Sequence, residues 1–287
     1  SGQTGRHRYM IVRAALMKGR MALESAGIGG AARDMRYLAA YVMGIATQDL
    51  PLRSQEALSP TQITALERAV DARALGQPIA QIIGKRQFWG RDFKVTRDVL
   101  DPRPETEGLV AAALTLPFHD VLDLGTGSGA ILLSLLADCP SARGLGVDIS
   151  LRALDVAREN AKVLQITLKR SVFLYSNWFE NVTGDFDLIV ANPPYITQEE
   201  MLSLDLGVLT YEPHLALSPG GDGLDPYRII ARDHGPFLRP LGRIIVEIGP
   251  CQAANVCALF KSQGLNGLKV HQDFDGRDRL VEAYKHA

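Results

Sequence analysis

The chain has 287 residues, 46% of them hydrophobic, and a formal net charge of −1 at pH 7. This length allows two domains with a hydrophobic core, and the near-zero charge excludes a strong overall field that would attract nucleic acid. No apolar run reaches the ~20 residues of a membrane helix, so no membrane span is predicted. As a separate expectation, a bacterial cytoplasm is favoured over a mitochondrial matrix. The three cysteines and six histidines lack metal-ligand spacing, so no metal site is predicted, and Ser1-Gly2 resembles a cloning remnant.

Amphipathic patterns predict a small all-helical domain over residues 1–76. Apolar residues recur at helical spacing in three segments: residues 10–26, 31–45 and 60–75. Ser59 is the predicted N-cap of the third helix, with Gln62 at the capping-box position, and Gly76 ends this helix. We expect the larger apolar side chains of the first two helices in the core of this domain: Met17, Met21, Tyr37 and Tyr41.

The charge is unevenly distributed along the chain. Residues 1–80 hold ten Lys/Arg and six Asp/Glu, whereas residues 81–287 hold 21 and 26. The basic part suits docking of an acidic or RNA-bearing partner, and it equally suits ordinary helix surface charge. The acidic balance of the longer part argues against a basic channel for nucleic acid.

The sequence of residues 77–103 predicts an extended linker between two domains. We expect extended backbone at its start, and residues 88–95 fit a hairpin that turns near Gly90 and Arg91. A helix is then expected over residues 104–116, because it begins with a proline and carries acids in its first turn.

Alternating strands and helices predict an α/β domain over residues 104–287. Strands are expected near residues 120–125, 143–148, 171–175, 186–191 and 242–248. Helices are expected near residues 129–138, 151–164, 225–238 and 251–263. Such alternation implies a doubly wound parallel sheet. Two further strands, residues 267–274 and 278–284, give this sheet an antiparallel C-terminal hairpin.

A glycine-rich turn, residues 125–129, follows the first of these strands. Its glycines let a ligand approach the backbone closely, and the helix behind it offers free N–H groups. About twenty residues on, Asp148 ends the next strand, where an acid accepts hydrogen bonds from ribose hydroxyls. The pattern predicts a nucleoside-containing cofactor. NAD or FAD stays an alternative, since Gly125-x-Gly127-x-x-Ala130 loosely fits the dinucleotide fingerprint, although nothing else supports hydride chemistry.

The tetrapeptide Asn192-Pro193-Pro194-Tyr195 follows an apolar run, at a strand end where open α/β sheets place their chemistry. Its prolines lack N–H groups and favour extended backbone, so the stiff loop presents carbonyl oxygens, a carboxamide and an aromatic face. This set suits a planar NH2 group, with two acceptors for its hydrogens and a ring against its plane. A base amine and a side-chain amide both fit, and a proline-rich turn without function is the other interpretation.

These motifs resemble those of class I S-adenosylmethionine-dependent methyltransferases. Asp123 and the glycine turn resemble the first motif of that superfamily, and Asp148 resembles its ribose-binding acid. The tetrapeptide resembles its motif for methylating amino nitrogens conjugated to a π system. The resemblance implies a mostly parallel, seven-stranded sheet with an antiparallel finish, and S-adenosyl-L-methionine as the cofactor.

Over nearly its whole length the chain resembles the HemK/PrmC family, which methylates the glutamine of the Gly-Gly-Gln loop in class I peptide-chain release factors. The helical N-terminal domain and Pro102-Arg103-Pro104-Glu105-Thr106-Glu107 carry the most specific part of this resemblance. Further matching segments are Arg73-x-x-Gly76-x-Pro78-Ile79, Gly84-x-x-x-Phe88-x-Gly90, Glu212-Pro213, Gly220 to Leu224 and Asp275-Gly276-Arg277-Asp278-Arg279. One departure concerns linker packing: the chain has Ala80-Gln81-Ile82 where the family usually has Gln-Tyr-Ile.

The resemblance implies a role for each matching residue. The cofactor would be held by Asp123, Gly125, Thr126, Gly127, Ser128, Gly129, Asp148, Trp178 and Asn192. Trp178 would lie against the adenine, unless it is a core aromatic. The substrate amide would be held by Asn192, Pro193, Pro194 and Tyr195, with the first two supplying acceptors and the tyrosine stacked on the amide. Arg103 and Glu105 would line the way to the substrate site or form salt bridges.

The mechanism follows from what an amide needs. A glutamine nitrogen is a poor nucleophile because its lone pair is delocalised into the carbonyl group. Two acceptors on its N–H groups restore electron density, aim the lone pair and stabilise the charge that builds during transfer. No histidine or acid in the motif acts as a base, so we expect the proton to leave afterwards to solvent.

Two other functions stay open on the sequence. A nucleic-acid methyltransferase acting on adenine N6 or guanine N2 uses the same tetrapeptide chemistry, although the chain lacks a separate base-reading domain of ~100 residues. A non-catalytic module that keeps a cofactor fold is the second, and the intact glycine turn, Asp148 and Asn192 argue against it. We expect class I release factors as partners, with no direct nucleic-acid substrate and no membrane partner.

Overall fold

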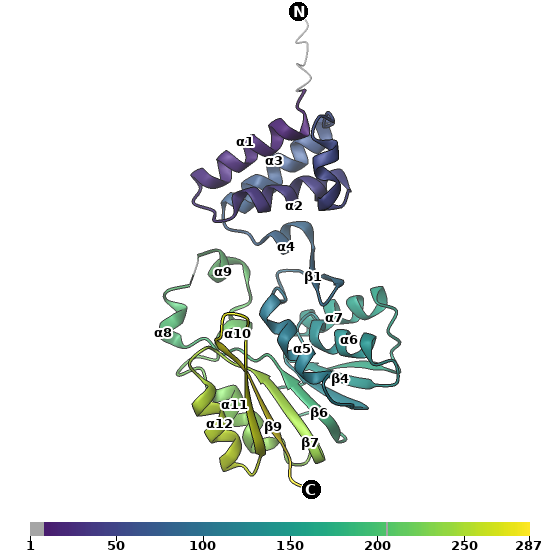
Figure 1. Ribbon diagram of the computed structural model, residues 1–287, viewed down its shortest axis with the longest axis vertical. Helices are drawn as coiled ribbons and strands as arrows, with labels where there is room; N and C mark the ends of the chain where they lie inside the picture. Colours follow the sequence, from purple (N-terminus) through teal and green to yellow (C-terminus); the bar gives the residue numbers. More distant parts are fainter. Residues whose placement is uncertain (1–8, 205) are drawn as a thin grey trace, which may run out of the picture. The chain divides into compact units, whose positions relative to one another are not determined.

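The computed structural model of the protein describes residues 9–204 and 206–287, so the Ser1-Gly2 pair lies outside the described part of the chain. Its contacts divide the chain into two compact units, and Figure 1 labels many of their elements. The first unit combines Ser1–Gly84 with Asp205–Tyr211, and the second combines Lys85–Leu204 with Glu212–Ala287. The division after Gly84 falls within the segment 77–103 that we interpret as a linker.

The first unit is helical, as the sequence predicts. Its elements are α1 (Val12–Ser25), α2 (Ala31–Met43), the 3-10 helix η1 (Thr47–Arg53), α3 (Pro60–Ala74), α4 (Ile79–Ile83) and α9 (Leu206–Tyr211). The capping box of α3 is confirmed, because the Ser59 hydroxyl accepts from the Gln62 backbone N–H and the Gln62 side chain accepts from the Ser59 backbone N–H. The prediction of extended backbone after residue 77 was wrong, since Pro78 leads into α4 and Gly84, with a φ of 75°, ends it.

The core of this unit differs from the predicted one. Met17 and Met21 are 62% and 63% exposed, and Tyr37 and Tyr41 are exposed too. The buried face of α1 consists of Val12, Ala15, Gly19 and Leu23. Methionines at positions 17 and 21 point elsewhere, because each residue of a helix is rotated by ~100° from the one before it. The large side chains were assigned to the core on their hydrophobicity, whereas small residues at Ala15 and Gly19 allow α1 to pack closely on α2.

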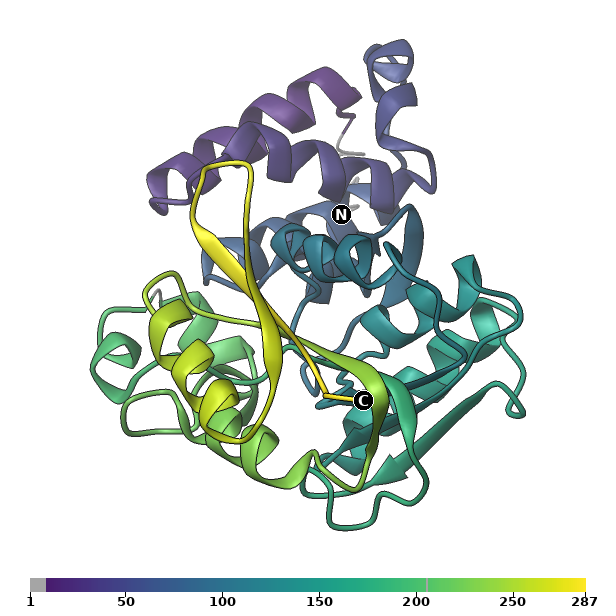
Figure 2. The same cartoon turned by 60° about the horizontal axis from the view of Figure 1, so that its bottom comes forward.

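The second unit contains a seven-stranded sheet, as predicted, with the order β5-β4-β3-β6-β7-β9-β8. Its strands are β3 (Asp120–Leu124), β4 (Arg143–Asp148), β5 (Ser171–Tyr175), β6 (Phe186–Ala191), β7 (Leu238–Glu247), β8 (Asn266–Gln272) and β9 (Asp278–Tyr284). The first five are parallel, and β9 is antiparallel to both β7 and β8. Figure 2 shows this C-terminal hairpin in yellow.

A small antiparallel hairpin precedes the sheet, formed by β1 (Lys85–Phe88) and β2 (Arg91–Lys94). It turns at Trp89 and Gly90, one residue earlier than expected, and both residues have positive φ angles of 49° and 69°. Two left-handed residues match the twist of a two-residue hairpin. Phe88 and Phe93 pack edge to face in the core of the second unit, with ring centroids 6.0 Å apart.

Helices cover both faces of the sheet. The helices of this unit are the 3-10 helix η2 (Pro104–Thr106), α5 (Glu107–Ala113), α6 (Ala130–Asp138), α7 (Leu151–Val163), α8 (Gln198–Met201), α10 (His214–Leu217), α11 (Asp225–Asp233) and α12 (Ala253–Ser262). The short helices α8, α9 and α10 were not predicted. The predicted alternation also fails once, because residues 176–185 join β5 to β6 without a helix.

The strands bury both of their faces, which explains their continuous apolar sequences. Val121 and Leu188 belong to the core beneath α5, α6 and α7, whereas Leu122 and Ile189 belong to the core beneath α11 and α12. None of the helices in the described part of the chain has the length and apolar character needed to span a membrane.

The strand order places the predicted motifs at one edge of the sheet. From β3 the chain continues outward through β4 to β5, and then returns to β6 on the other side of β3. A crevice opens at such a switch point, outside the carboxyl ends of the strands. Leu124 pairs with both Val147 and Ala191, so the segments after β3, β4 and β6 begin at the same level.

Candidate active site

The glycine turn after β3 borders a pocket of about 530 Å³ at this edge of the sheet. The N–H groups of Gly125 and Thr126 both donate to the Val147 carbonyl at 2.9 Å, which fixes the turn to β4. Gly125 and Gly127 have φ angles of 71° and 53°, a conformation that favours glycine. Apart from their chain neighbours, none of the described residues has an atom within 4 Å of where their Cβ atoms would be, so a ligand has access to this backbone.

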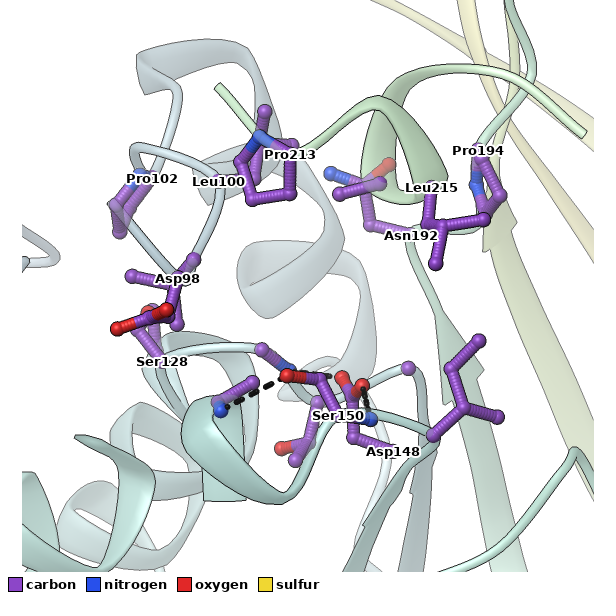
Figure 3. A pocket seen from close by; sticks show the side chains of 18 of the residues that line it. Asp98, Leu100, Pro102, Ser128, Asp148, Ser150, Asn192, Pro194, Pro213 and Leu215 are labelled. Atoms are coloured by element: carbon purple, nitrogen blue, oxygen red, sulfur yellow. Dashed lines mark hydrogen bonds between the residues drawn. The ribbon is translucent and has the colours of Figure 1, made fainter. Parts of the chain in front are cut away.

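Asp148 lies at the end of β4, on the floor of the pocket. Its Oδ2 accepts from Gly127 N–H and its Oδ1 accepts from Ser150 N–H, each at 2.9 Å, as the dashed lines of Figure 3 indicate for the residues drawn. Burial raises the pKa of this carboxyl group, and the same two N–H groups act in the opposite direction. A carboxylate has about four lone pairs, so after these backbone N–H groups at least one remains for a ligand hydroxyl.

Asp123 and Gly129 lie beneath the turn rather than on the pocket wall. The Asp123 carboxylate is fully buried and accepts from the Thr126 hydroxyl at 2.7 Å. Its burial raises the pKa to about 7, and its Oδ1 has no hydrogen-bond partner in the part of the chain that the structure describes. A Cβ at Gly129 would lie 3.0 Å from Leu133, so this glycine permits close packing of the turn on α6. A direct contact of either residue with the cofactor stays a prediction.

Trp178 lines the pocket from the segment after β5. Its φ is 53°, which is rare for an aromatic residue, and the Ser176 hydroxyl donates to its carbonyl at 2.8 Å. The side chain is half-buried and also packs against the core beneath α11 and α12. Trp178 therefore borders both the core and the pocket, and its contact with the adenine stays a prediction.

Asn192 extends into the pocket from the end of β6. Figure 3 shows it above Asp148 and Ser150, beside Pro213 and Leu215. Its Nδ2 donates to the Thr106 hydroxyl at 3.2 Å, and Pro194 is a second wall residue from the same loop. The structure thus brings the acceptor side chain of the tetrapeptide into the same pocket as the glycine turn.

Pro193 and Tyr195 lie behind this wall. Pro193 is buried, and the Tyr195 hydroxyl donates to Glu247 Oε1 at 3.4 Å. The Tyr195 carbonyl accepts from Gln252 Nε2 at 3.0 Å. Gly223 (φ 75°) supports the loop from outside, since a Cβ there would lie 2.3 Å from the Tyr195 carbonyl oxygen. The predicted stacking of Tyr195 on a substrate stays a prediction.

Arg103 forms the predicted salt bridge and lines the pocket as well. Its Nη2 donates to both oxygens of Glu212, at 2.7 and 2.8 Å, and this pair holds the chain just before the wall formed by residues 213–216. Burial raises the pKa of Glu212, and Arg103 opposes that shift. Glu105 is exposed and does not border the pocket.

Replacing Arg103 should destabilise the protein in a pH-dependent manner. Arg103→Ala leaves the buried Glu212 carboxylate unpaired, which we expect to lower the free energy of unfolding by about 2 kcal/mol, less than for a fully buried pair because Arg103 is 38% exposed. The folded-state pKa of Glu212 then rises further above its unfolded value, so the loss should be larger at pH 8 than at pH 5. Urea unfolding at both pH values measures it. Arg103→Met with Glu212→Leu is the control, and an equal loss in that double variant would contradict the account.

Several wall residues were not predicted from the sequence. Apolar side chains surround the opening: Phe88, Val99, Leu100, Pro102, Pro213 and Leu215. Thr106 and, behind it, Glu247 contact the tetrapeptide, and both are buried. The only sequence signal for Glu247 is an acid directly after the apolar end of a strand. The structure shows no group of three or more possible metal ligands among the residues that it describes.

The residues present fit S-adenosyl-L-methionine, the cofactor that the motifs imply. The open backbone of the glycine turn has room for a ligand, the remaining lone pairs of Asp148 suit ribose hydroxyls, and the Trp178 ring offers an apolar face. The volume lies within the ~300–1,000 Å³ of small-molecule sites.

Comparisons with known proteins agree with this site. Residues 14–84 match the PrmC N-terminal domain, and residues 104–223 match the methyltransferase small domain. The release factor glutamine methyltransferase of Cereibacter sphaeroides is 52% identical over 261 residues, covering 91% of this chain and 94% of that protein. The enzyme of the same name from Agrobacterium fabrum is 39% identical, covering 94% of this chain and 96% of its own length.

A solved structure supports the fold independently. A methyltransferase from Pyrococcus furiosus superposes with a TM-score of 0.54 at 16% identity, covering 76% of this chain and 98% of that one. This similarity concerns the fold alone, whereas the curated relatives match along both units. Because a relative is 52% identical over 91% of this chain, the chain belongs to the HemK/PrmC family of S-adenosylmethionine-dependent release factor glutamine methyltransferases.

Proposed function

We propose that this protein methylates the side-chain amide nitrogen (N5) of the glutamine in the Gly-Gly-Gln motif of class I peptide-chain release factors. The observation that carries the proposal is the position of Asn192, which shares one pocket with the glycine turn and Asp148. The relatives named release factor glutamine methyltransferase support the substrate. We assign recognition of the rest of the release factor to the helical N-terminal domain.

The cofactor residues fix where the reaction takes place. When bound, S-adenosyl-L-methionine supplies an electrophilic methyl group on a sulfonium centre. The glycine turn would pass beneath its amino-acid end, Asp148 would accept from its ribose, and Trp178 would lie against its adenine. Because these groups follow three neighbouring strands, the sheet holds them at fixed separations.

The tetrapeptide residues act on the substrate. The Asn192 carbonyl oxygen and the Pro193 backbone carbonyl would accept the two hydrogens of the glutamine amide, with Pro194 and Tyr195 completing the site. Acceptors held in place before the reaction stabilise the positive charge that develops on nitrogen. The tetrapeptide has no side chain that acts as a base, so the proton leaves to solvent after transfer.

One assay tests this function against its rival. The protein is incubated with methyl-labelled cofactor and, separately, with a class I release factor, the same factor with alanine in place of the Gly-Gly-Gln glutamine, bare DNA and bare RNA. We expect label only in the unaltered release factor. Label in a nucleic acid, or equal label in both release factors, would overturn the proposal.

A further inference from the structure

A chain of buried polar groups lies behind the acceptor side chain of the pocket. Asn192 Nδ2 donates to Thr106 Oγ1 at 3.2 Å, and Thr106 Oγ1 donates to Glu247 Oε2 at 2.6 Å. The three residues come from the loop after β6, from η2 and from the end of β7. Thr106 and Glu247 are only 4% and 2% exposed. A charged carboxylate in such a place is costly unless its partners compensate for it, so the presence of Glu247 here calls for an explanation.

The chemistry of the three groups gives the chain a direction. An ionised carboxylate only accepts hydrogen bonds, so the single hydrogen of the Thr106 hydroxyl is committed to Glu247. The Thr106 oxygen is then left with lone pairs toward Asn192, and it accepts an N–H from the carboxamide. The Asn192 nitrogen therefore faces Thr106, and the carbonyl oxygen of the same side chain is left as the acceptor for a ligand in the pocket.

Without such a constraint, an asparagine side chain can turn over, which exchanges its oxygen and its nitrogen. The turned side chain would present N–H groups to the glutamine NH2 group, and two donors would then face each other. Only one of the two orientations gives the substrate an acceptor. The reaction of the proposed function therefore depends on something that selects this orientation.

We propose that Thr106 and Glu247 are positioning residues, which hold the Asn192 carbonyl oxygen toward the substrate amide. The inference rests on the proposed function for the identity of that amide. Neither residue needs to touch the reacting atoms, because both act through Asn192.

The same carboxylate also holds the other end of the tetrapeptide. The second carboxylate oxygen of Glu247, Oε1, accepts from the Tyr195 hydroxyl. The backbone carbonyl of Glu247 accepts from the Tyr227 hydroxyl at 2.8 Å. Glu247 thus contacts the loop at two points, one of them through Thr106. A hydrogen-bonded group of this kind costs most when it is only partly satisfied, which favours one arrangement of the loop.

The charge of Glu247 should control the direction of the chain. Burial raises its pKa to about 7, with Glu105 acting in the same direction and Thr106, Arg279 and Tyr195 acting against it. The Tyr227 hydroxyl also lies near Glu247 and donates to its backbone carbonyl. A protonated Glu247 donates to Thr106, whose hydrogen then turns toward Asn192 and reverses the orientation of the amide. We therefore expect kcat to rise with pH through this range.

A hydroxyl-deleting variant tests the role of Thr106. Thr106→Val keeps the shape of the side chain and removes the donor, and we expect kcat to fall by ~10–100-fold with the cofactor Kd unchanged. Thr106→Ser keeps the hydroxyl and should retain most of the activity. If the valine variant turned over as fast as the serine variant, Thr106 would have no positioning role.

A double variant separates positioning from mere structural support. Adding Thr106→Val to Asn192→Ala should change kcat by less than ~2-fold, because the group that Thr106 positions is already absent. Structural damage would lower kcat equally in both backgrounds, and that result would overturn the inference. Glu247→Gln should remove the rise of kcat near pH 7. If kcat of Glu247→Gln still rose near pH 7, the rise would come from another group such as Asp123, whose pKa is also raised to about 7, and the role of the Glu247 charge would be contradicted.

A measurement without turnover keeps this inference distinct from the proposed function. In protein labelled with 15N at asparagine, the Asn192 side-chain amide signal, identified by its loss in Asn192→Ala, should shift with pH and a midpoint near 7. The shift should disappear in Glu247→Gln and in Thr106→Val. A signal that is independent of pH and also unchanged in Glu247→Gln and in Thr106→Val would overturn the inference, whereas a wild-type protein that fails to methylate a release factor would overturn only the proposed function.

Discussion

Asn192→Ala is expected to reduce turnover of the release factor by about 10²–10³-fold, the usual loss when one preorganised polar group at a site of charge development is removed. The variant keeps the two prolines, so the loop retains its stiffness and its backbone carbonyls. It removes the side-chain acceptor that would make the amide nitrogen a better nucleophile and stabilise its charge. The loss should therefore appear in kcat.

The measurement is the initial rate of label transfer at saturating cofactor, together with the cofactor Kd from calorimetry. Asn255→Ala, an exposed position on α12, is the matched control and should behave as wild type. A fall in turnover of less than ~10-fold would show that the acceptor account is wrong. A large rise in Kd with little change in kcat would instead assign Asn192 mainly to the cofactor.

Asp148→Ala is expected to weaken cofactor binding by about 10–100-fold, because it removes charged hydrogen bonds worth ~1.5–3 kcal/mol. Two effects contribute. The ribose loses its acceptor, and the N–H groups of Gly127 and Ser150 lose the carboxylate that holds them at 2.9 Å. The glycine turn then becomes less ordered at the point where the ligand approaches its backbone.

Calorimetry with S-adenosylhomocysteine, the demethylated cofactor, measures this effect. An analogue without ribose hydroxyls should bind the wild type more weakly, but should bind Asp148→Ala about as well as the parent compound does. Asp155→Ala, at a position that is 70% exposed on α7, is the matched control. A Kd for Asp148→Ala within ~2-fold of wild type would exclude a ribose contact.

Much of the second unit could be predicted from the sequence, because its strands bury both faces and are marked by continuous apolar runs. The bounds of β4, β5 and β6 agree with the expected residues. The glycine turn and Asn192 were found for the same reason, since each directly follows such a run. The rule that ligands bind at the carboxyl ends of parallel strands was enough to expect them near one another.

The sequence predictions were wrong or incomplete where tertiary contacts determine which residues are buried or brought together. Helix α1 has more apolar residues than its buried face can hold, so periodicity alone did not show that Met17 and Met21 are exposed. The short helices of residues 196–224 have too few turns to leave a periodic pattern. Thr106 and Glu247 are 141 positions apart, and only the fold brings them together behind Asn192.

Gly223 limits which amino-acid substitutions this protein can tolerate. It lies outside the pocket, yet a single added carbon at this position would collide with the Tyr195 carbonyl. The conformation of the loop formed by Asn192-Pro193-Pro194-Tyr195 therefore depends partly on a residue outside that loop. Replacing Gly223 with any other amino acid would require the loop to move, even though the new side chain would not contact the substrate.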